Sequence, residues 1–392
     1  MSAAPISAGH EDVDRRRWFI TIGIGLAVWV AQRLALIAAM ASDGPVVPRL
    51  TRWDGRWYSV IAAGGYHWPN PMFGHTDPWI SDLAFLPGLP ALGRVIILVT
   101  GMSPYLAILI AAQMGFLTAA AVITAVGHRV AGPTAAVLLV ACWGAAPRAV
   151  VESMGYTEGW FIALVGLGLL AILSGRWILA GVFVGVAGLF RASVAPVCIV
   201  LGIAWLTSLC TKAEAGQRWR RFVGMALSPL GLLTWFVIVA HRTGRWNGYL
   251  LVQKAWGSEM GTLLDTWEDL HSRMDHVPFD WRYTGLVALT WCMYLALGIV
   301  MAVRREQVWL TGYVLVTVIF VGHMQGYFNS KARFLLPAFP AFLPVARLLD
   351  RSPRWLQAVF VLVISAVSTW WSLDILGPVS YTHLTLPTNR EV

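Results

Sequence analysis

The sequence predicts an all-α polytopic membrane protein. Of its 392 residues, 57% are hydrophobic and only 12% are charged, which is about half the charged share of a soluble protein. At about 20 residues per crossing, this apolar content is enough for about eleven transmembrane helices. The apolar residues lie in unbroken runs, not in the period-2 alternation of a lipid-facing strand, which argues against an outer-membrane barrel. The arithmetic also excludes a large soluble head on a single anchor.

The first apolar run is predicted to be a span with a cytoplasmic N-terminus. Residues 18–40 directly follow Arg15, Arg16 and Arg17. The run is too long for a signal peptide, and no small-residue cleavage pattern follows it. The three arginines at its start place the N-terminus inside the cell by the positive-inside rule.

The next segment, residues 41–104, is polar and rich in tryptophan, and it then forms the first outer loop. Within it, residues 54–64 and 83–100 are expected to be short helices in the membrane interface, because Trp prefers the headgroup level. Residues 83–100 could instead be a full span. That alternative would reverse the orientation of everything after it.

Charge favours the interfacial alternative. The later spans are then expected at residues 105–126, 134–149, 156–173, 177–190, 193–210, 222–240, 284–303, 308–323, 334–349 and 355–376. This arrangement places five short basic loops inside, as the positive-inside rule requires: residues 128–129, 174–176, 212–221, 304–305 and 347–354. The outer side receives the longer segments 41–104, 148–155, 241–283 and 322–333.

The chain shows no internal repeat and no soluble domain, so residues 1–378 are expected to form one membrane domain. Residues 379–392 share nothing with the Arg/Ala/Trp-rich composition before them and are expected to be a non-native tail, with an ordinary disordered tail as the alternative. The net charge of +9 comes from short clusters between apolar runs, so no nucleic-acid partner is expected. The four cysteines form no CxxC pair, and neither a metal nor a cofactor is expected.

Asp54 is the leading candidate for chemistry. It stands at or near the start of the predicted helix 54–64, where unpaired amide groups and the helix dipole favour an ionised carboxylate. A purely structural role as the N-cap of this helix would explain Asp54 equally well. The flanking Arg52 and Arg56, among interfacial Trp and Tyr residues, favour a carboxylate that handles a polar group beside a membrane-held substrate.

Other charged residues gather at the same predicted face. Glu158 lies just inside a span, where a carboxylate either pairs across the bundle or binds substrate. Arg191 lies between two apolar runs, and snorkelling is its simplest explanation. Lys331 and Arg333 violate the positive-inside preference, and an anionic ligand such as a phosphate would explain them. Because Walker, dinucleotide, HExxH and nucleophile-elbow motifs are absent from the sequence, group transfer from a membrane-held anionic donor, or transport, remains.

Four motifs resemble those of the PIG-V-type mannosyltransferases, which add the second mannose in GPI-anchor assembly, and of their actinobacterial relatives. Residues 52–58, Arg-Trp-Asp-Gly-Arg-Trp-Tyr, followed by Gly65-Tyr66, are similar to the family's first outer loop. Residues 84–90 resemble its Ala-Phe-Phe-Pro-x-x-Pro, residues 156–158 its Tyr-Ser-Glu, and residues 333–340 its Arg-Tyr/Phe-x-x-Pro-x-x-Pro. The order agrees up to about Leu349. Arg191 falls in the family's Thr-Arg-Pro-x-Gly, but Ala192 and Val194 replace the Pro and Gly.

The resemblance implies a GT-C-type bundle and an inverting glycosyltransferase of the plasma membrane with its site on the outer face. Mannose, or a relative such as arabinose, would pass from a polyprenyl-phosphate donor to a hydroxyl of a lipid, glycan or protein acceptor. Asp54 would be the general base, and Arg191, Lys331 and Arg333 would hold the phosphate. The residues expected to bind substrate are Arg52, Arg56, Trp57, Tyr58, Tyr66, Tyr156, Glu158, Arg191, Lys331 and Arg333. A transporter or flippase for a lipid-linked sugar is the alternative, and the lack of internal repeats disfavours it.

Overall fold

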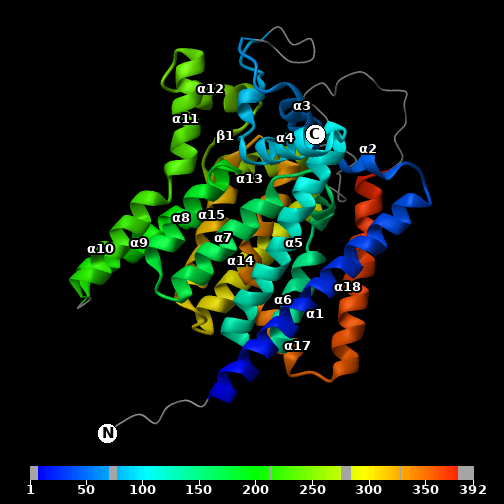
Figure 1. Cartoon of the computed structure of the whole chain (residues 1–392), viewed down its shortest axis with the longest axis vertical. Coiled ribbons are helices and arrows are strands. Elements are labelled where there is room, and N and C mark those ends of the chain that lie inside the picture. Colours follow the sequence, from blue (N-terminus) through cyan, green and yellow to red (C-terminus); the bar gives the residue numbers. More distant parts are fainter. Residues whose placement is uncertain (1–7, 70–76, 212–213, 275–283, 327, 378–392) are drawn as a thin grey trace.

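The protein is a bundle of helices, seen here in a computed structural model (Figure 1). The structure describes residues 8–69, 77–211, 214–274, 284–326 and 328–377. In this part of the chain, six helical segments are long and apolar enough to cross a membrane: Arg15–Ala41, Pro104–Ala131, Ala192–Cys210, Ala215–Thr243, Leu286–Val303 and Arg354–Ile375. The predicted all-α polytopic fold is therefore confirmed.

The helices behind these segments are α1 (Ala8–Ala41), α5 (Pro104–Ala131), α9 (Ala195–Cys210), α10 (Ala215–Leu227) joined to α11 (Leu230–Thr243), α14 (Leu286–Val303) and α18 (Arg354–Ile375). Five shorter apolar helices accompany them: α4 (Gly88–Thr100), α6 (Pro133–Gly144), α7 (Glu158–Leu173), α8 (Trp177–Ala187) and α15 (Val308–His323). All ten later runs are helical at or near the expected places. The total of about eleven spans stays a prediction, because each of these five helices is shorter than the roughly 20 residues that a membrane crossing needs.

The expected span at residues 334–349 is not one straight helix. The chain there forms η6 (Phe328–Ser330), α16 (Lys331–Phe334), η7 (Leu336–Phe342) and α17 (Leu343–Asp350), and its two halves bend by 57°. Pro337 and Pro340 cause the break, since they lack the amide hydrogen that a continuous helix needs. The break makes α16 a separate short helix that carries Lys331 and Arg333.

The first outer loop contains the two short helices that the sequence predicts, α3 (Asp54–Gly64) and α4. It also contains α2 (Val46–Leu50) and the 3-10 turn η2 (Asp82–Ala84), which the sequence does not predict. The second predicted helix begins at Gly88 instead of Leu83, because Pro87 occupies its N-cap. At 13 residues, α4 is about 20 Å long, similar to α6 and α8.

A second irregular layer lies beside this loop. It consists of α12 (Gly248–Ala255), the strand β1 (Glu259–Met260) and α13 (Leu263–Met274). β1 pairs antiparallel with β2 (Met324–Gln325), so the segment before α13 is tied to the end of α15. Short 3-10 turns, η3 (Ala149–Ser153) and η4 (Ala192–Val194), precede α7 and α9.

Glycines bring α5 and α7 into close contact at the centre of the bundle. A Cβ on Gly159 would lie 2.5 Å from the Phe116 amide nitrogen, and one on Gly115 would lie 2.6 Å from the Trp160 amide nitrogen. Small residues allow this approach of helix backbones in membrane bundles. The contact holds the N-terminus of α7 against α5, which also packs on α3.

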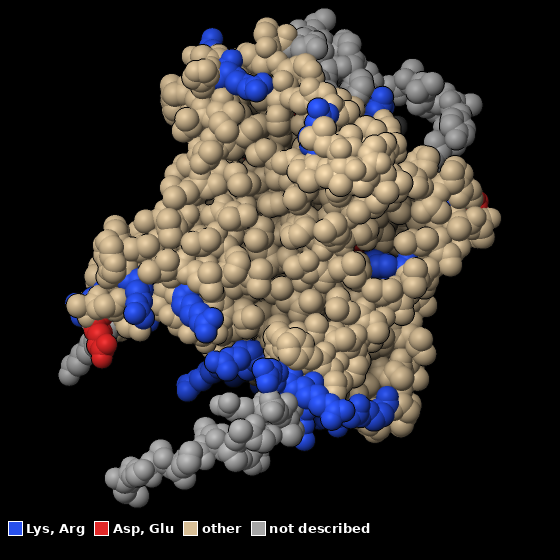
Figure 2. Space-filling model, viewed as in Figure 1, with Lys and Arg blue, Asp and Glu red and all other residues tan. Residues whose placement is uncertain are grey.

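Charge is distributed unequally between the two ends. Figure 2 shows Lys and Arg gathered along the lower end of the bundle, where Figure 1 places α17, α10 and the start of α1. The outer-loop helices α2, α3 and α4 lie at the other end (Figure 1). The predicted tail, residues 379–392, lies outside the described residues.

Candidate active site

Four predicted charged residues meet at the outer-loop end of the bundle. Asp54 is the first residue of α3, Glu158 the first of α7, Arg191 precedes η4, and Arg333 belongs to α16. Arg333 Nη1 donates a hydrogen bond to Asp54 Oδ2 at 2.8 Å. Arg191 Nη1 lies 2.6 Å from Glu158 Oε1, and Arg333 Nε lies 3.9 Å from the same oxygen. Two carboxylates and two guanidinium groups thus form one network.

The local backbone fixes the position of Asp54. The N-cap of α3 is Trp53 and not Asp54, and the Asp54 carboxylate points to Arg333. The simple cap explanation for Asp54 is therefore wrong. Trp53 has φ +51°, which a bulky residue rarely adopts and which occurs most often at functional sites.

Glu158 holds the two arginines together. Its side chain is only 1% exposed, and it stands at the N-terminus of α7, where the helix dipole favours a negative charge. Glu158 Oε1 is engaged by Arg191, whereas Glu158 Oε2 and Arg333 Nε have no hydrogen-bond partner among the described residues. Buried polar atoms are normally paired, so these atoms have free capacity for a ligand or for water.

Tyrosine and threonine side chains surround the network. Tyr58 Oη lies 3.5 Å from Thr157 Oγ1, which also accepts a hydrogen bond from Arg191 Nη1 at 3.3 Å. The Arg333 guanidinium lies over the Tyr156 ring, 5.2 Å from its centroid. Burial raises the pKa of Tyr58 above the ordinary range. This phenol therefore stays neutral at physiological pH.

An aromatic cluster continues from α3. The Trp57 ring stacks on Phe85 at 5.7 Å and meets the edge of Trp256 at 5.1 Å. Tyr66 donates its hydroxyl hydrogen to the Phe85 carbonyl at 2.9 Å and packs against Trp235. Phe85 belongs to the second of the four sequence motifs, so that motif contributes through packing.

Three predicted residues lie outside the network. Lys331 is buried, and its Nζ donates to Thr266 Oγ1 at 2.8 Å and to the Gly322 carbonyl at 3.2 Å, on the side of α13. Arg52 Nη2 donates to the Gly377 carbonyl at 3.3 Å. Arg56 is exposed on α3.

The sequence reasoning missed Thr157 and Trp256. Thr157 is the middle residue of the motif at residues 156–158, so its place between Tyr156 and Glu158 could have identified it as a site residue. Trp256 comes from residues 241–283, where no motif indicates a contact with α3. Only the folded chain brings the two segments together.

Glu152, a neighbour of the site in sequence, belongs to a separate buried cluster. Its Oε2 accepts a hydrogen bond from Trp29 Nε1 at 2.7 Å and lies 3.7 Å from Arg33 Nη1. Burial raises the pKa of Glu152 to about 7, against the opposing effect of Arg33. These contacts tie α1 to η3.

Comparison with solved structures defines the fold class. ArnT from Cupriavidus metallidurans matches in its apo state with a TM-score of 0.55 at 17% identity, and bound to undecaprenyl phosphate with a TM-score of 0.54 at 16% identity. In both comparisons 92% of this chain is covered, and the chain spans 64% of the length of ArnT. An Archaeoglobus fulgidus oligosaccharyltransferase tethered to an acceptor peptide aligns with a TM-score of 0.49 at 14% identity, covering 90% of this chain and 54% of that one.

The chain thus has the GT-C-type fold of polytopic membrane proteins. No protein-family model matches it, and no curated protein sequence does. The predicted GT-C-type fold is confirmed, whereas the resemblance to PIG-V-type enzymes stays a prediction.

Proposed function

We propose that the protein is an integral-membrane glycosyltransferase that takes a sugar from a polyprenyl-phosphate donor. The network of Asp54, Glu158, Arg191 and Arg333 carries this proposal. Two guanidinium groups beside two carboxylates suit a reaction in which a phosphate leaves while a hydroxyl loses its proton. The GT-C fold, shared with ArnT bound to undecaprenyl phosphate, supports the same donor class.

In the proposed reaction, the Asp54 carboxylate accepts the proton of the acceptor hydroxyl. The hydroxyl oxygen forms a bond to the anomeric carbon of the sugar, and the bond from that carbon to the phosphate oxygen breaks. The electron pair leaves with the polyprenyl phosphate, whose charge Arg191 and Arg333 stabilise. Attack opposite the leaving group inverts the anomeric configuration.

The Asp54–Arg333 ion pair has a place in this scheme. Without donor, Arg333 donates a hydrogen bond to the Asp54 carboxylate at 2.8 Å and so occupies one of its oxygens. A donor phosphate would compete for Arg333 through Nε, which has no hydrogen-bond partner among the described residues. Donor binding would then release Asp54 for proton transfer, so the base becomes active only when the sugar is present.

The finer assignments rest on the sequence. Mannose is the proposed sugar because of the PIG-V-type motifs, and the acceptor is a hydroxyl of a lipid, glycan or protein. An outer-face position of the Asp54 network at the plasma membrane is proposed, and the basic loops support it through the positive-inside rule. Tyr58, Tyr156 and the Trp57 cluster are proposed to line the sugar and acceptor positions. Lys331 and Arg52, whose contacts lie elsewhere, are proposed to support the surrounding loops.

The decisive experiment supplies polyprenyl-phosphate [14C]mannose to membranes that contain the protein. Transfer of label to an acceptor, lost on Asp54→Asn replacement, is the expected result. Protein-dependent flipping of the labelled lipid with no label on any acceptor would overturn the enzyme and favour the flippase alternative.

A further inference from the structure

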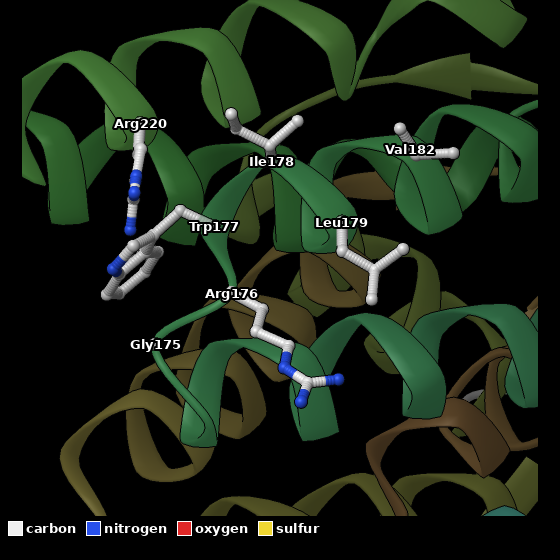
Figure 3. A pocket seen from close by; sticks show the side chains of 7 residues that line it. All are labelled: Gly175, Arg176, Trp177, Ile178, Leu179, Val182 and Arg220. Carbon is white, nitrogen blue, oxygen red and sulfur yellow. The ribbon is translucent and has the colours of Figure 1, made fainter.

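A cavity of about 380 Å³ lies between α8 and α10, away from the Asp54 network (Figure 3). It is lined by Arg176, Trp177, Ile178, Leu179, Val182 and Arg220. Helix α7 separates the two places, since it begins with Glu158 and ends at Leu173, just before the cavity. Its 16 residues span about 24 Å, so the cavity lies near the opposite end of the bundle.

Close packing of α8 on α10 fixes the wall of this cavity. A Cβ on Gly181 would collide with the Gly224 carbonyl, and one on Gly224 would collide with the Trp177 carbonyl. The buried Trp177 ring also meets the edge of Trp309 at 5.6 Å. Backbone contact at two glycines leaves little freedom, so α10 holds Arg220 beside α8, while the guanidinium of the neighbouring Arg221 lies over the Trp177 ring, 4.5 Å from its centroid.

Two arginines at the cavity have no partner in the part of the chain that the structure describes. Arg218 and Arg221 donate to the carbonyls of Thr211 and Ala204, at 3.1 and 3.0 Å. The side chains of Arg176 and Arg220, in contrast, make no hydrogen bond or ion pair with a described residue. Figure 3 shows them on opposite sides of Trp177.

The cavity continues into an apolar track along α8. Ile178, Leu179 and Val182 are 39%, 38% and 44% exposed, and Val186 extends the same side of the helix. From Arg176 to Val186 the track is about 15 Å long, which is half of the ~30 Å hydrocarbon core. A ligand with a phosphate at one end and an acyl chain at the other would match both parts.

We propose that this cavity binds an anionic phospholipid such as phosphatidylglycerol from the leaflet at this end of the protein. The phosphate lies at the end of the cavity that Arg176 and Arg220 line, and each guanidinium offers a fork of donors that suits phosphate oxygens. One acyl chain lies on Ile178, Val182 and Val186. The bound lipid ties the turn between α7 and α8 to α10. The inference does not depend on the proposed glycosyl transfer.

A soluble phosphate is the less suitable occupant. It would use the two arginines but leave the apolar track in contact with lipid tails. The track and the charges share one opening, which favours a molecule that needs both. The matching length of the track and of one leaflet supports the same choice.

Native mass spectrometry of the full-length protein in detergent tests the proposal with phosphatidylglycerol, phosphatidylcholine and glycerol 3-phosphate as probes. The wild type should retain phosphatidylglycerol in preference to the other two. The double variant Arg176→Gln/Arg220→Gln should bind it about 30-fold more weakly, at about fivefold per arginine near a membrane surface. A matched control is Arg351→Gln/Arg354→Gln, which removes two exposed arginines outside the cavity and should retain the lipid like the wild type.

Three results would overturn the proposal. Equal retention of phosphatidylcholine would show that the phosphate is not recognised through its net charge. Equal binding of glycerol 3-phosphate would assign the cavity to a soluble phosphate. An equal loss in the control variant would show that total positive charge, and not this cavity, attracts the lipid.

Discussion

Replacement of Asp54 by Asn separates a catalytic role from a structural one. Asn keeps the size of the side chain but removes the proton acceptor and the charge that faces Arg333 at 2.8 Å. The two side chains are 26% and 17% exposed, so loss of this partly solvated pair should cost about 1 kcal/mol of stability or less. Loss of a general base lowers kcat by roughly 10²–10⁴-fold, or about 3–5 kcal/mol of activation free energy.

The Asp54–Arg333 ion pair also predicts how each variant changes the KM for the donor. Asp54→Asn removes the group that competes with the donor phosphate for Arg333, so KM should stay unchanged or fall. Arg333→Gln should do the opposite. It removes a charge-assisted hydrogen bond of about 1.5–3 kcal/mol, which corresponds to a rise of about 10- to 150-fold in KM, with a smaller change in kcat.

The assay measures kcat and KM for polyprenyl-phosphate [14C]mannose with both variants and the wild type, in protein whose apparent Tm and elution volume show that it is folded. A folded Asp54→Asn protein with wild-type kcat would refute the reasoning. Glu158 would then become the leading candidate for the base.

The remaining predictions concern the surroundings of the site. Glu158→Gln leaves Arg191 and Arg333 without their shared buried counter-charge, so it should lower stability by about 3–5 kcal/mol, seen as a lower apparent Tm; an unchanged Tm would contradict the role of Glu158. Burial raises the pKa of Glu152 to about 7, so between about pH 5 and pH 7 the folded protein holds a proton that the unfolded chain has lost. The Tm should therefore fall as the pH rises from about 5 to 7 and then level off. Glu152→Gln should flatten this pH dependence while its amide oxygen still accepts from Trp29. In a cysteine-free background, Cys at position 68 should react with an impermeant thiol reagent in intact cells and Cys at position 215 should not; reversed labelling would place Asp54 inside the cell.

Hydrophobic runs and charge bias in the sequence alone determined the fold class. Apolar runs of 14–23 residues predict helices wherever the backbone must satisfy its own hydrogen bonds in lipid, and the structure has helices at all of these places. The helix Asp54–Gly64 has its predicted bounds, because Gly65, with φ +83°, ends it. The sequence alone also identifies four candidate site residues, because a charged side chain in or beside a membrane segment is costly and usually functional. They are Asp54, Glu158, Arg191 and Arg333.

Only the tertiary structure decided which of these charges meet. Asp54 and Arg333 are 279 positions apart, and no sequence spacing predicts a 2.8 Å contact between them. The proline break before α17 and the glycine contact between α5 and α7 bring Arg333 and Glu158 to α3, while the buried bonds of Lys331 to Thr266 and Gly322 hold it apart. Polarity and hydrophobicity are properties of single residues, whereas ion pairing depends on distance, and distances across a bundle are set by the packing of all its helices together.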